Sequence, residues 1–314
     1  MTTMSHTLPT SSPEKRPRRY WPRFRFSLRT LLILMLVAAL ALGLPRWRSR
    51  SQHQIAGRLQ LKGARFLWLG LDREPQSKIK RLVFGDDQYD FLSQINFKGG
   101  TLTDAEMKGL SQFPNLDALE FHQCELKKSG LASIGSLPKL WRLEFDECRF
   151  SGRDLAELRH LSKLKALTIA NAAVTDVDFH ILPELGLLEL RGKLIDDSTL
   201  QQIAQMESLQ ALELRDTRIT DDGLAPLQAL TKLHILTIRN SAVSGRGLSA
   251  FSESSTLLDL DLRGSAVDGQ GIEQISRIRT LRTVDLSSTP ATAADILKLQ
   301  QSLPNCRRIF SDIK

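Results

Sequence analysis

A phrase of about 24 residues recurs along this chain, and its regularity limits what the chain can fold into. Two groups of leucines define the phrase where it is clearest: Leu209, Leu212 and Leu214, spaced as LxxLxL, and then Leu224, Leu227 and Leu230. Alternating leucines are typical of a short strand with one buried face, whereas leucines three residues apart indicate one face of a short helix. One strand and one helix cannot enclose a core alone, so the unit must stack on copies of itself.

The copies are present along most of the chain. The first leucine of each LxxLxL group falls at Leu92, Leu116, Leu140, Leu164, Leu185, Leu209, Leu233, Leu257 and Leu281. Successive steps are equal in length, except that the step from Leu164 to Leu185 is shorter than the others. We therefore predict nine stacked units, with a shortened turn or helix over Asn171–Leu185.

This pattern resembles the leucine-rich-repeat family, in its form of about 24 residues related to the cysteine-containing and ribonuclease-inhibitor-like types. The resemblance covers Ile79–Ile309 and is carried best by ITDDGL at Ile219–Leu224, VTD at Val174–Asp176 and LTD at Leu102–Asp104. It implies an α/β solenoid, with a curved parallel β-sheet on the concave side and short helices on the convex side. We assign residues 90–291 to the repeats.

The loop before each helix carries two further signals. Thr220 or Asp221 is placed to cap the helix of its unit, because a side-chain oxygen accepts from the first free N–H groups of a helix. Glycines recur at matching positions just before the helices, at Gly130, Gly223, Gly247 and Gly271. We interpret this recurrence as a shared requirement of the backbone that glycine meets.

The basic charge of the chain is concentrated in its first 50 residues. The formal net charge is +8, but residues 1–50 hold ten Lys/Arg and one acid, and the remainder, with 33 basic and 34 acidic residues, is nearly neutral. A high pI that belongs to a tail argues against nucleic-acid binding by the repeats. We expect no nucleic-acid partner.

An uncharged stretch, Thr30–Pro45, follows seven basic residues that lie between Glu14 and Arg29. It would span roughly 24 Å as a helix, which is short for a membrane span, although flanking residues could extend it. The excess of basic residues before it favours an N-terminus in the cytoplasm and repeats outside. We predict a disordered basic cytoplasmic tail over residues 1–29 and a single transmembrane helix or signal anchor over residues 30–45.

Alternatives for this segment stay open. Ala39-Leu40-Ala41 resembles a signal-peptide cleavage site, and cleavage would leave the repeats secreted or periplasmic. A buried helix in a soluble protein is the other alternative. The stretch RFSLRTLLILML at Arg25–Leu36 also resembles the N-terminal anchors of bacterial exported leucine-rich-repeat proteins, which implies the anchored arrangement.

Terminal repeats need a cover, since their outer face would otherwise expose the stacked core. We assign residues 51–89 to a juxtamembrane segment and N-terminal cap, with a helix over Ser51–Gly63 and strands over Arg65–Leu71 and Ile79–Phe84. Residues 292–314 are assigned to a C-terminal cap, in which a last helix, a Pro-Asn turn and a closing strand follow one another.

Two columns of side chains are expected on the concave face of the sheet. The column between the second and third apolar positions of each strand runs Asn96, Glu120, Glu144, Thr168, Glu189, Glu213, Thr237, Asp261 and Asp285. The column just after the third apolar position runs Lys98, His122, Asp146, Ala170, Arg191, Arg215, Arg239, Arg263 and Ser287. Because neighbouring strands lie about 4.8 Å apart, an acidic column should lie beside an arginine column.

Seven residues of these columns form the candidate partner-binding strip: Glu189, Arg191, Glu213, Arg215, Arg239, Asp261 and Arg263. Arginine binds carboxylates and phosphates in bidentate fashion, so the strip could dock such groups of a protein or peptide. The alternative is that each arginine pairs with an acid next to it, which would make the strip a structural feature of low energetic weight.

Cys124 and Cys148 occupy the same position of consecutive units and should be stacked neighbours. The simpler interpretation is a pair of small buried thiols, and a disulfide, which an exported domain would permit, is the alternative. We expect Cys306 to be unpaired. No CxxC pattern is present and the histidines are scattered, so we expect no metal site.

Enzyme signatures such as GxSxG, HExxH and the P-loop pattern are missing from the sequence. We expect no catalytic residues, no cofactor and no small-molecule substrate, and predict a membrane-anchored, non-enzymatic scaffold that binds a protein or peptide on the concave sheet. One alternative is a soluble cytoplasmic adaptor or inhibitor, like the repeat proteins of ubiquitin ligases or ribonuclease inhibition. Another is a hydrolase that uses His122 and Asp146.

Overall fold

The computed structural model describes residues 51–68, 92–113, 115–172, 177–179, 182 and 185–312. The predicted tail over 1–29, the predicted membrane segment over 30–45 and the predicted strand over Ile79–Phe84 lie outside these residues. The chain divides into two compact units, Met1–Leu44 and Pro45–Lys314. All of the described residues fall in the second unit.

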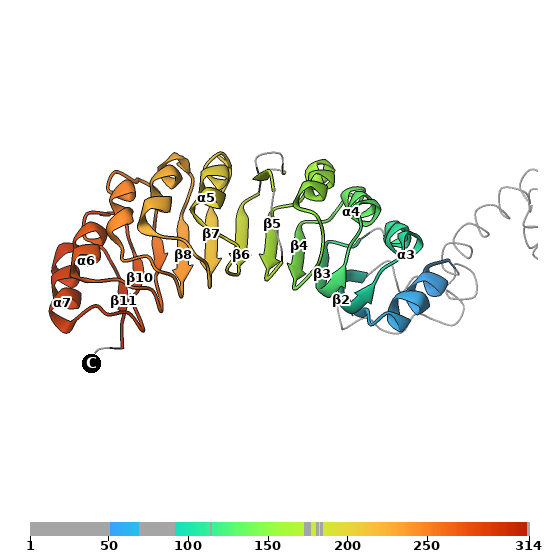
Figure 1. Cartoon of the computed structure of the whole chain (residues 1–314), viewed down its shortest axis with the longest axis horizontal. Helices are drawn as coiled ribbons and strands as arrows, with labels where there is room; N and C mark the ends of the chain where they lie inside the picture. The colour runs from blue at the N-terminus through green and yellow to red at the C-terminus, as the bar shows by residue number, and fades with distance from the viewer. Residues whose placement is uncertain are drawn as a thin grey trace, which may run out of the picture. The chain divides into compact units, whose positions relative to one another are not determined.

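Strands of the described residues form one continuous sheet, in which each strand pairs with the next along the chain (Figure 1). They are β1 Arg65–Trp68, β2 Leu92–Thr101, β3 Ala118–Glu125, β4 Arg142–Asp146, β5 Ala166–Ala170, β6 Leu187–Arg191, β7 Ala211–Arg215, β8 Ile235–Arg239, β9 Asp259–Asp261, β10 Thr283–Asp285 and β11 Arg308–Phe310. Strands β2 to β11 are parallel, as predicted. Strand β1, which lies in the predicted N-terminal cap, pairs antiparallel with β2 and so covers its free hydrogen-bonding edge.

Short helices connect the strands on the side of the sheet that holds the core (Figure 1). Those with defined bounds are α3 Asp104–Gly109, η2 Leu110–Gln112, α4 Lys128–Gly135, η3 Gly152–His160, α5 Asp197–Ile203, η5 Asp221–Ala229, η6 Arg246–Phe251, α6 Gly269–Ile275 and α7 Ala293–Ser302. The elements labelled η are 3₁₀ helices. In η5 the buried Leu224 and Leu227 are three residues apart, which is the period of a 3₁₀ helix rather than that of an α-helix.

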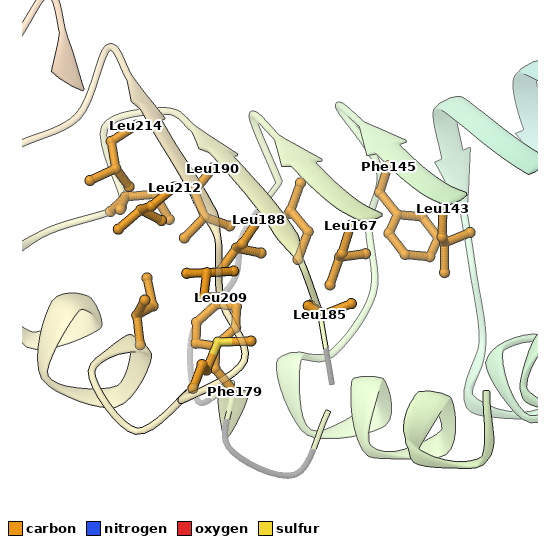
Figure 2. Close-up of a cluster of buried hydrophobic side chains, with 14 of the residues drawn as sticks. Leu143, Phe145, Leu167, Phe179, Leu185, Leu188, Leu190, Leu209, Leu212 and Leu214 are labelled. Atoms are coloured by element: carbon orange, nitrogen blue, oxygen red, sulfur yellow. The ribbon is translucent and has the colours of Figure 1, made fainter. Parts of the chain in front are cut away.

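The core is a stack of apolar side chains that continues from one unit to the next. Leu188, Leu212 and Leu236 occupy paired positions of neighbouring strands and are fully buried. Figure 2 shows Leu167, Leu188 and Leu212 on the same side of their strands, each beside the next. Each unit therefore completes the core of its neighbours, which is the arrangement that the leucine spacing predicts.

Phenylalanines replace the third leucine in the first units and stack on one another. The ring centroids of Phe97 and Phe121 are 5.0 Å apart with an interplanar angle of 5°, and those of Phe121 and Phe145 are 5.6 Å apart at 19°. Larger rings at this position contribute more buried apolar area per unit.

Both ends of the stack are covered by further elements. At the N-terminal end residues 51–61 are helical, Ala56 and Leu59 are fully buried, and Gln52 Nε2 donates to the Gln112 carbonyl at 2.7 Å. At the other end α7, a turn at Pro304-Asn305 and β11 follow in that order. The predicted closing helix, turn and strand are thus confirmed, as is the predicted strand that begins at Arg65. The domain boundaries themselves stay predictions.

The single shortened step lies in the connection between β5 and β6. Leu167 pairs with Leu188 as Leu188 pairs with Leu212, so the sheet register is unchanged. The missing residues are therefore taken from the connection. Half of that connection lies outside the described residues, and Phe179 within it is buried.

Aspartates at the starts of the helices link each unit to the next. Asp197 accepts from the N–H and the hydroxyl of Thr220 at 2.9 and 2.7 Å. Asp221 accepts from the N–H and the hydroxyl of Ser244 at 2.9 and 2.8 Å, and from the N–H of Gly247 at 2.8 Å. The prediction that Thr220 or Asp221 caps η5 is wrong, since the Thr220 side chain makes no capping hydrogen bond. Asp221 instead accepts a hydrogen bond from the start of the next helix, because stacking brings the free N–H groups of η6 within its reach.

The recurring glycines leave room for this close contact between loops. A Cβ atom on Gly247 would lie 2.2 Å from the Asp221 carbonyl oxygen, and one on Gly271 would lie 1.9 Å from the Ser244 carbonyl oxygen. Neither glycine has a positive φ. At Gly247 and Gly271 the requirement is therefore the close approach of the neighbouring unit, and not a left-handed backbone conformation. At Gly130 a Cβ atom would meet only the Met107 side chain, at 3.4 Å.

Leu212→Asp is expected to lower the free energy of unfolding by more than about 3 kcal/mol and to unfold several units, because it buries an unpaired carboxylate in the stacked core. Leu194→Asp is the control, since Leu194 is 55% exposed. Thermal unfolding followed by circular dichroism measures both variants. Equal midpoints for the two would contradict the stacked core.

Gly247→Ala is expected to destabilise the protein by about 1–3 kcal/mol, because its Cβ atom would push the η6 loop away from Asp221. Gly57→Ala is the control: a Cβ atom there meets nothing within 4 Å, and alanine favours the helix at residues 51–61 by up to about 1 kcal/mol. Urea unfolding of both variants gives the comparison. The interpretation fails if Gly247→Ala is as stable as Gly57→Ala.

Candidate interaction surface

The solvent-facing side of the sheet carries the two predicted columns as adjacent rows. Glu189 pairs with Glu213 in the strand register, and Arg191 pairs with Arg215, which pairs in turn with Arg239. Side chains alternate between the two faces along a strand, so these residues point away from the buried leucines. The rows themselves are confirmed, whereas their role in partner binding stays a prediction.

Arginines and acids of the strip pair with one another over β6 and β7. Arg191 Nη2 donates to Glu189 Oε1 at 3.2 Å, and Arg215 Nε lies 3.4 Å from the same oxygen. Arg215 Nη2 also donates to Glu213 Oε2 at 2.5 Å. One carboxylate, Glu189, therefore bridges two arginines of neighbouring strands.

A second group of pairs lies over β8 to β10. Asp261 Oδ2 accepts from Arg239 Nε at 2.9 Å and from Arg263 Nη2 at 2.8 Å. Arg263 Nε lies 3.3 Å from Asp285 Oδ2. Thr237 replaces an acid at the paired position on β8, so it separates this group from the first one.

The strip is neutral together with Asp285. Its four arginines are matched by its own three acids, Glu189, Glu213 and Asp261, and by Asp285 on the next strand, and the paired side chains are 17–42% exposed. The observed contacts are those of the alternative in which each arginine pairs with an acid next to it. A partner would therefore meet guanidinium groups that are already held by carboxylates, with only their remaining N–H donors free to bind.

Neighbouring side chains favour the charged forms of Asp261 and Arg215. Burial raises the pKa of Asp261, but the hydrogen bonds from Arg263 and Arg239 outweigh burial and hold that pKa below its ordinary value of 3.8. Burial likewise works against the charged form of Arg215, and the hydrogen bond to Glu213 with the charge of Glu189 outweighs it, so the pKa of Arg215 is raised.

A row of apolar residues lies beside the acidic row and was not predicted as part of the strip. Ala166, Leu187, Ala211 and Ile235 are paired in register at the starts of β5 to β8. Ile235 is 39% exposed and Leu187 is half-buried. The row ends where the paired positions on β4 and β9 become Arg142 and Asp259, so in the sequence it appears in only four consecutive units.

His122 and Asp146, the residues of the hydrolase alternative, are neighbours on β3 and β4. His122 Nδ1 lies 3.4 Å from Asp146 Oδ2, and the side chains are 27% and 29% exposed. Both lie on the open face of the sheet, where side chains do not enclose a substrate as a catalytic pocket does. This geometry adds no support for hydrolysis, and the absence of enzymatic activity stays a prediction.

Cys124 and Cys148 are free and buried, as the simpler interpretation predicts. Cys148 Sγ donates to the Phe121 carbonyl at 3.2 Å, and its hydrogen bond with Cys124 together with burial raises its pKa far above the usual range. Later units place a hydroxyl at the same position: Ser265 Oγ donates to the Ile238 carbonyl at 2.8 Å. In these two units the position holds a small donor that reaches the backbone of the preceding unit, whereas another unit has Ala172 there. Cys306 is also free.

The comparison with family models matches residues 205–227 to the leucine-rich repeat. These residues include β7 and most of η5, one turn of the stack. The fold is a leucine-rich-repeat solenoid. The match covers one repeat, and the strand register carries the same unit along the sheet.

Solved structures that resemble this solenoid include proteins of two bacteria. An internalin C2 from Listeria monocytogenes is 19% identical with a TM-score of 0.42, and the alignment covers 71% of this chain and 82% of that one. A leucine-rich-repeat protein from Leptospira interrogans is 20% identical with a TM-score of 0.49, covering 70% and 55%. InlP from Listeria monocytogenes is 18% identical with a TM-score of 0.49, covering 72% and 62%. No curated protein matches the sequence.

Asp261→Asn is expected to destabilise the protein by about 1–3 kcal/mol at pH 7, because it removes the negative charge that Arg239 and Arg263 share and places an amide N–H₂ group beside them. The pKa of Asp261 is lowered in the folded state, so its stabilising contribution is complete above about pH 4 and is lost as the pH falls through the folded-state pKa. Urea unfolding at pH 7 and pH 2.5 measures the difference from the unmutated protein.

The control for this prediction is Asp222→Asn, at an exposed position of η5, for which we expect little change at either pH. A destabilisation by Asp261→Asn that is the same at pH 7 and pH 2.5 would show that the carboxylate charge does not hold the strip together.

Proposed function

We propose that this protein is a non-enzymatic scaffold that binds a protein or peptide on the exposed face of its sheet and is anchored to a membrane by Thr30–Pro45. The observation that carries the proposal is the position of the apolar row directly beside the charge-paired strip on β5 to β8. Leucine-rich-repeat solenoids serve as protein-interaction domains, and the open sheet offers a long surface for a partner.

The chemistry of the two rows suits a protein partner. Protein interfaces combine an apolar centre with a polar rim, and arginine is enriched among the residues that dominate binding. Here Ile235 and Leu187 would supply the apolar centre, and Arg215 and Arg239 the rim. Because ion pairs already hold the arginines, less side-chain freedom would be lost on binding.

The neutrality of the strip bears on which partners it would accept. Nucleic acids bind to proteins chiefly through uncompensated Lys and Arg at their phosphates, and every arginine of the strip has a carboxylate partner. A peptide that carries both acidic and basic side chains could pair its acids with the arginines of the strip and its basic groups with the carboxylates, which would leave no charge unpaired. Such pairing would contribute orientation and specificity more than affinity.

Membrane anchoring rests on the sequence. Within the described part of the chain, no helix has the length and apolar character required to cross a bilayer, and Thr30–Pro45 lies outside that part. We propose a single-pass bacterial protein with its N-terminus in the cytoplasm and its repeats, of the cysteine-containing or ribonuclease-inhibitor-like type, outside. Cleavage after Ala41 would make it secreted or periplasmic, and a soluble cytoplasmic adaptor or inhibitor is the second candidate.

Photo-crosslinking tests the binding surface. With a photoreactive residue in place of Ile235, the full chain is expected to form a discrete cross-linked protein band in cells. The same residue in place of Leu297, which is 56% exposed on α7, is the control and should not. The double variant Arg215→Ala/Arg239→Ala should weaken the band while its Tm stays within about 4 °C, since exposed ion pairs contribute about 0–1 kcal/mol each. Equal bands from positions 235 and 297 would exclude this surface.

Membrane anchoring is tested by deleting residues 30–45. The full chain is expected in the membrane fraction of bacterial cells, with repeats that are digested by protease added outside the inner membrane. The deletion should move the protein to the soluble fraction, whereas deletion of residues 2–13 should not. Protection of the repeats until the inner membrane is broken would overturn the proposed orientation.

A further inference from the structure

A pocket of about 570 Å³ lies at the C-terminal end of the repeats, away from the strip. It is formed by the three loops that lead into β9, β10 and β11. The polar residues that line it and carry the argument are Ser255, Arg279, Arg282, Asn305 and Arg307. Three of its lining residues are therefore arginines, and no acidic side chain lines it.

Two of these arginines occupy equivalent positions of stacked units. The N–H of Arg282 donates to the Leu258 carbonyl at 2.8 Å, and the N–H of Arg307 donates to the Arg282 carbonyl at 2.8 Å. The backbones at Arg282 and Arg307 are thus held at the spacing of neighbouring strands, about 4.8 Å. The two arginine side chains therefore leave the backbone at neighbouring positions of the stack.

The contrast with the strip is what distinguishes this pair. Every arginine of the strip has a carboxylate partner, whereas neither Arg282 nor Arg307 forms a side-chain ion pair or hydrogen bond with any residue that the structure describes. Arg279 completes the pocket, and its Nη1 donates to the Ser302 carbonyl, which orients its guanidinium at the rim. The side-chain N–H groups of Arg282 and Arg307 therefore remain available to bind an anion.

We propose that this pocket is a binding site for a phosphate group, either free or as a phosphomonoester. A tetrahedral dianion offers several oxygens to the guanidinium forks of Arg282 and Arg307 and neutralises both charges, which a single carboxylate does not. The hydroxyl of Ser255 and the amide of Asn305 supply further donors. The volume of the pocket leaves room for an organic group beyond the phosphate.

Isothermal titration calorimetry of the full chain with inorganic phosphate, at constant ionic strength, tests the site. We expect saturable binding, with glycerol phosphate bound as well and acetate bound at least about tenfold more weakly. Arg282→Ala and Arg307→Ala should each weaken phosphate binding about tenfold or more, since each removes a charge-assisted hydrogen bond. The phosphate affinity of Arg282→Lys should lie between those of the unmutated protein and Arg282→Ala, because lysine keeps the positive charge and lacks the guanidinium fork.

Arg277→Ala is the matched control, an exposed arginine of the same unit that pairs with Glu273 at 3.5 Å and does not line the pocket. It should bind phosphate as the unmutated protein does, and the Tm of every variant should stay within about 4 °C because all of these side chains are on the surface. Absence of saturable phosphate binding, equal binding of acetate, or equal weakening by Arg277→Ala would each overturn the proposal. The site does not depend on the proposed function, since Arg215→Ala should leave phosphate binding unchanged.

Discussion

Each unit of this solenoid buries its leucines only against the next unit, and that constraint dictates the rest of the structure. Strands must pair in register for Leu188, Leu212 and Leu236 to lie side by side. Once they do, every other position of the unit is also repeated at the strand spacing of about 4.8 Å. The rows on the open face are therefore a consequence of core packing, and they extend as far as the stack does.

Contacts between loops keep that register. The carboxylates of Asp197 and Asp221 bind the helix starts of the following units, and Cys148 and Ser265 donate to backbone carbonyls of the preceding units. Each of these groups would otherwise be a buried or half-buried polar atom without a partner, which costs free energy. A displaced unit would thus lose both its apolar contacts and its polar contacts. Both kinds of contact therefore fix the register of the stack.

Structural features that depend on spacing within a unit can be predicted from the sequence. Contacts that depend on the neighbouring unit cannot. The leucine period predicts the strands, their order and the two charged rows, because these follow from position within the unit. The target of Asp221 could not be read from η5 alone, because it lies in the following unit, at Gly247. The direction of β1 depends on the free edge of β2. The apolar row at Ile235 does not follow from the repeat, because the same position is charged on β4 and β9, at Arg142 and Asp259.

The same repetition brings charged side chains together at two places on the solenoid. Among the described residues they are paired at one place and unpaired at the other. Over β6 to β10 acids stand beside arginines and pair with them, whereas Arg282 and Arg307 at the last units form no side-chain ion pair with the residues that the structure describes. A paired surface favours a partner that makes many weak and oriented contacts, and an unpaired one favours an anion. The two surfaces can therefore serve different ligands on one solenoid.

Hydrogen exchange across the full chain tests the continuous stack most directly. Slowly exchanging amides should recur in β6, β7 and β8 with the period that separates Leu188, Leu212 and Leu236. From β5 to β6 the interval should be the shorter one that separates Leu167 from Leu188. Protection that shows no such period, or that keeps the full period between β5 and β6, would contradict the account.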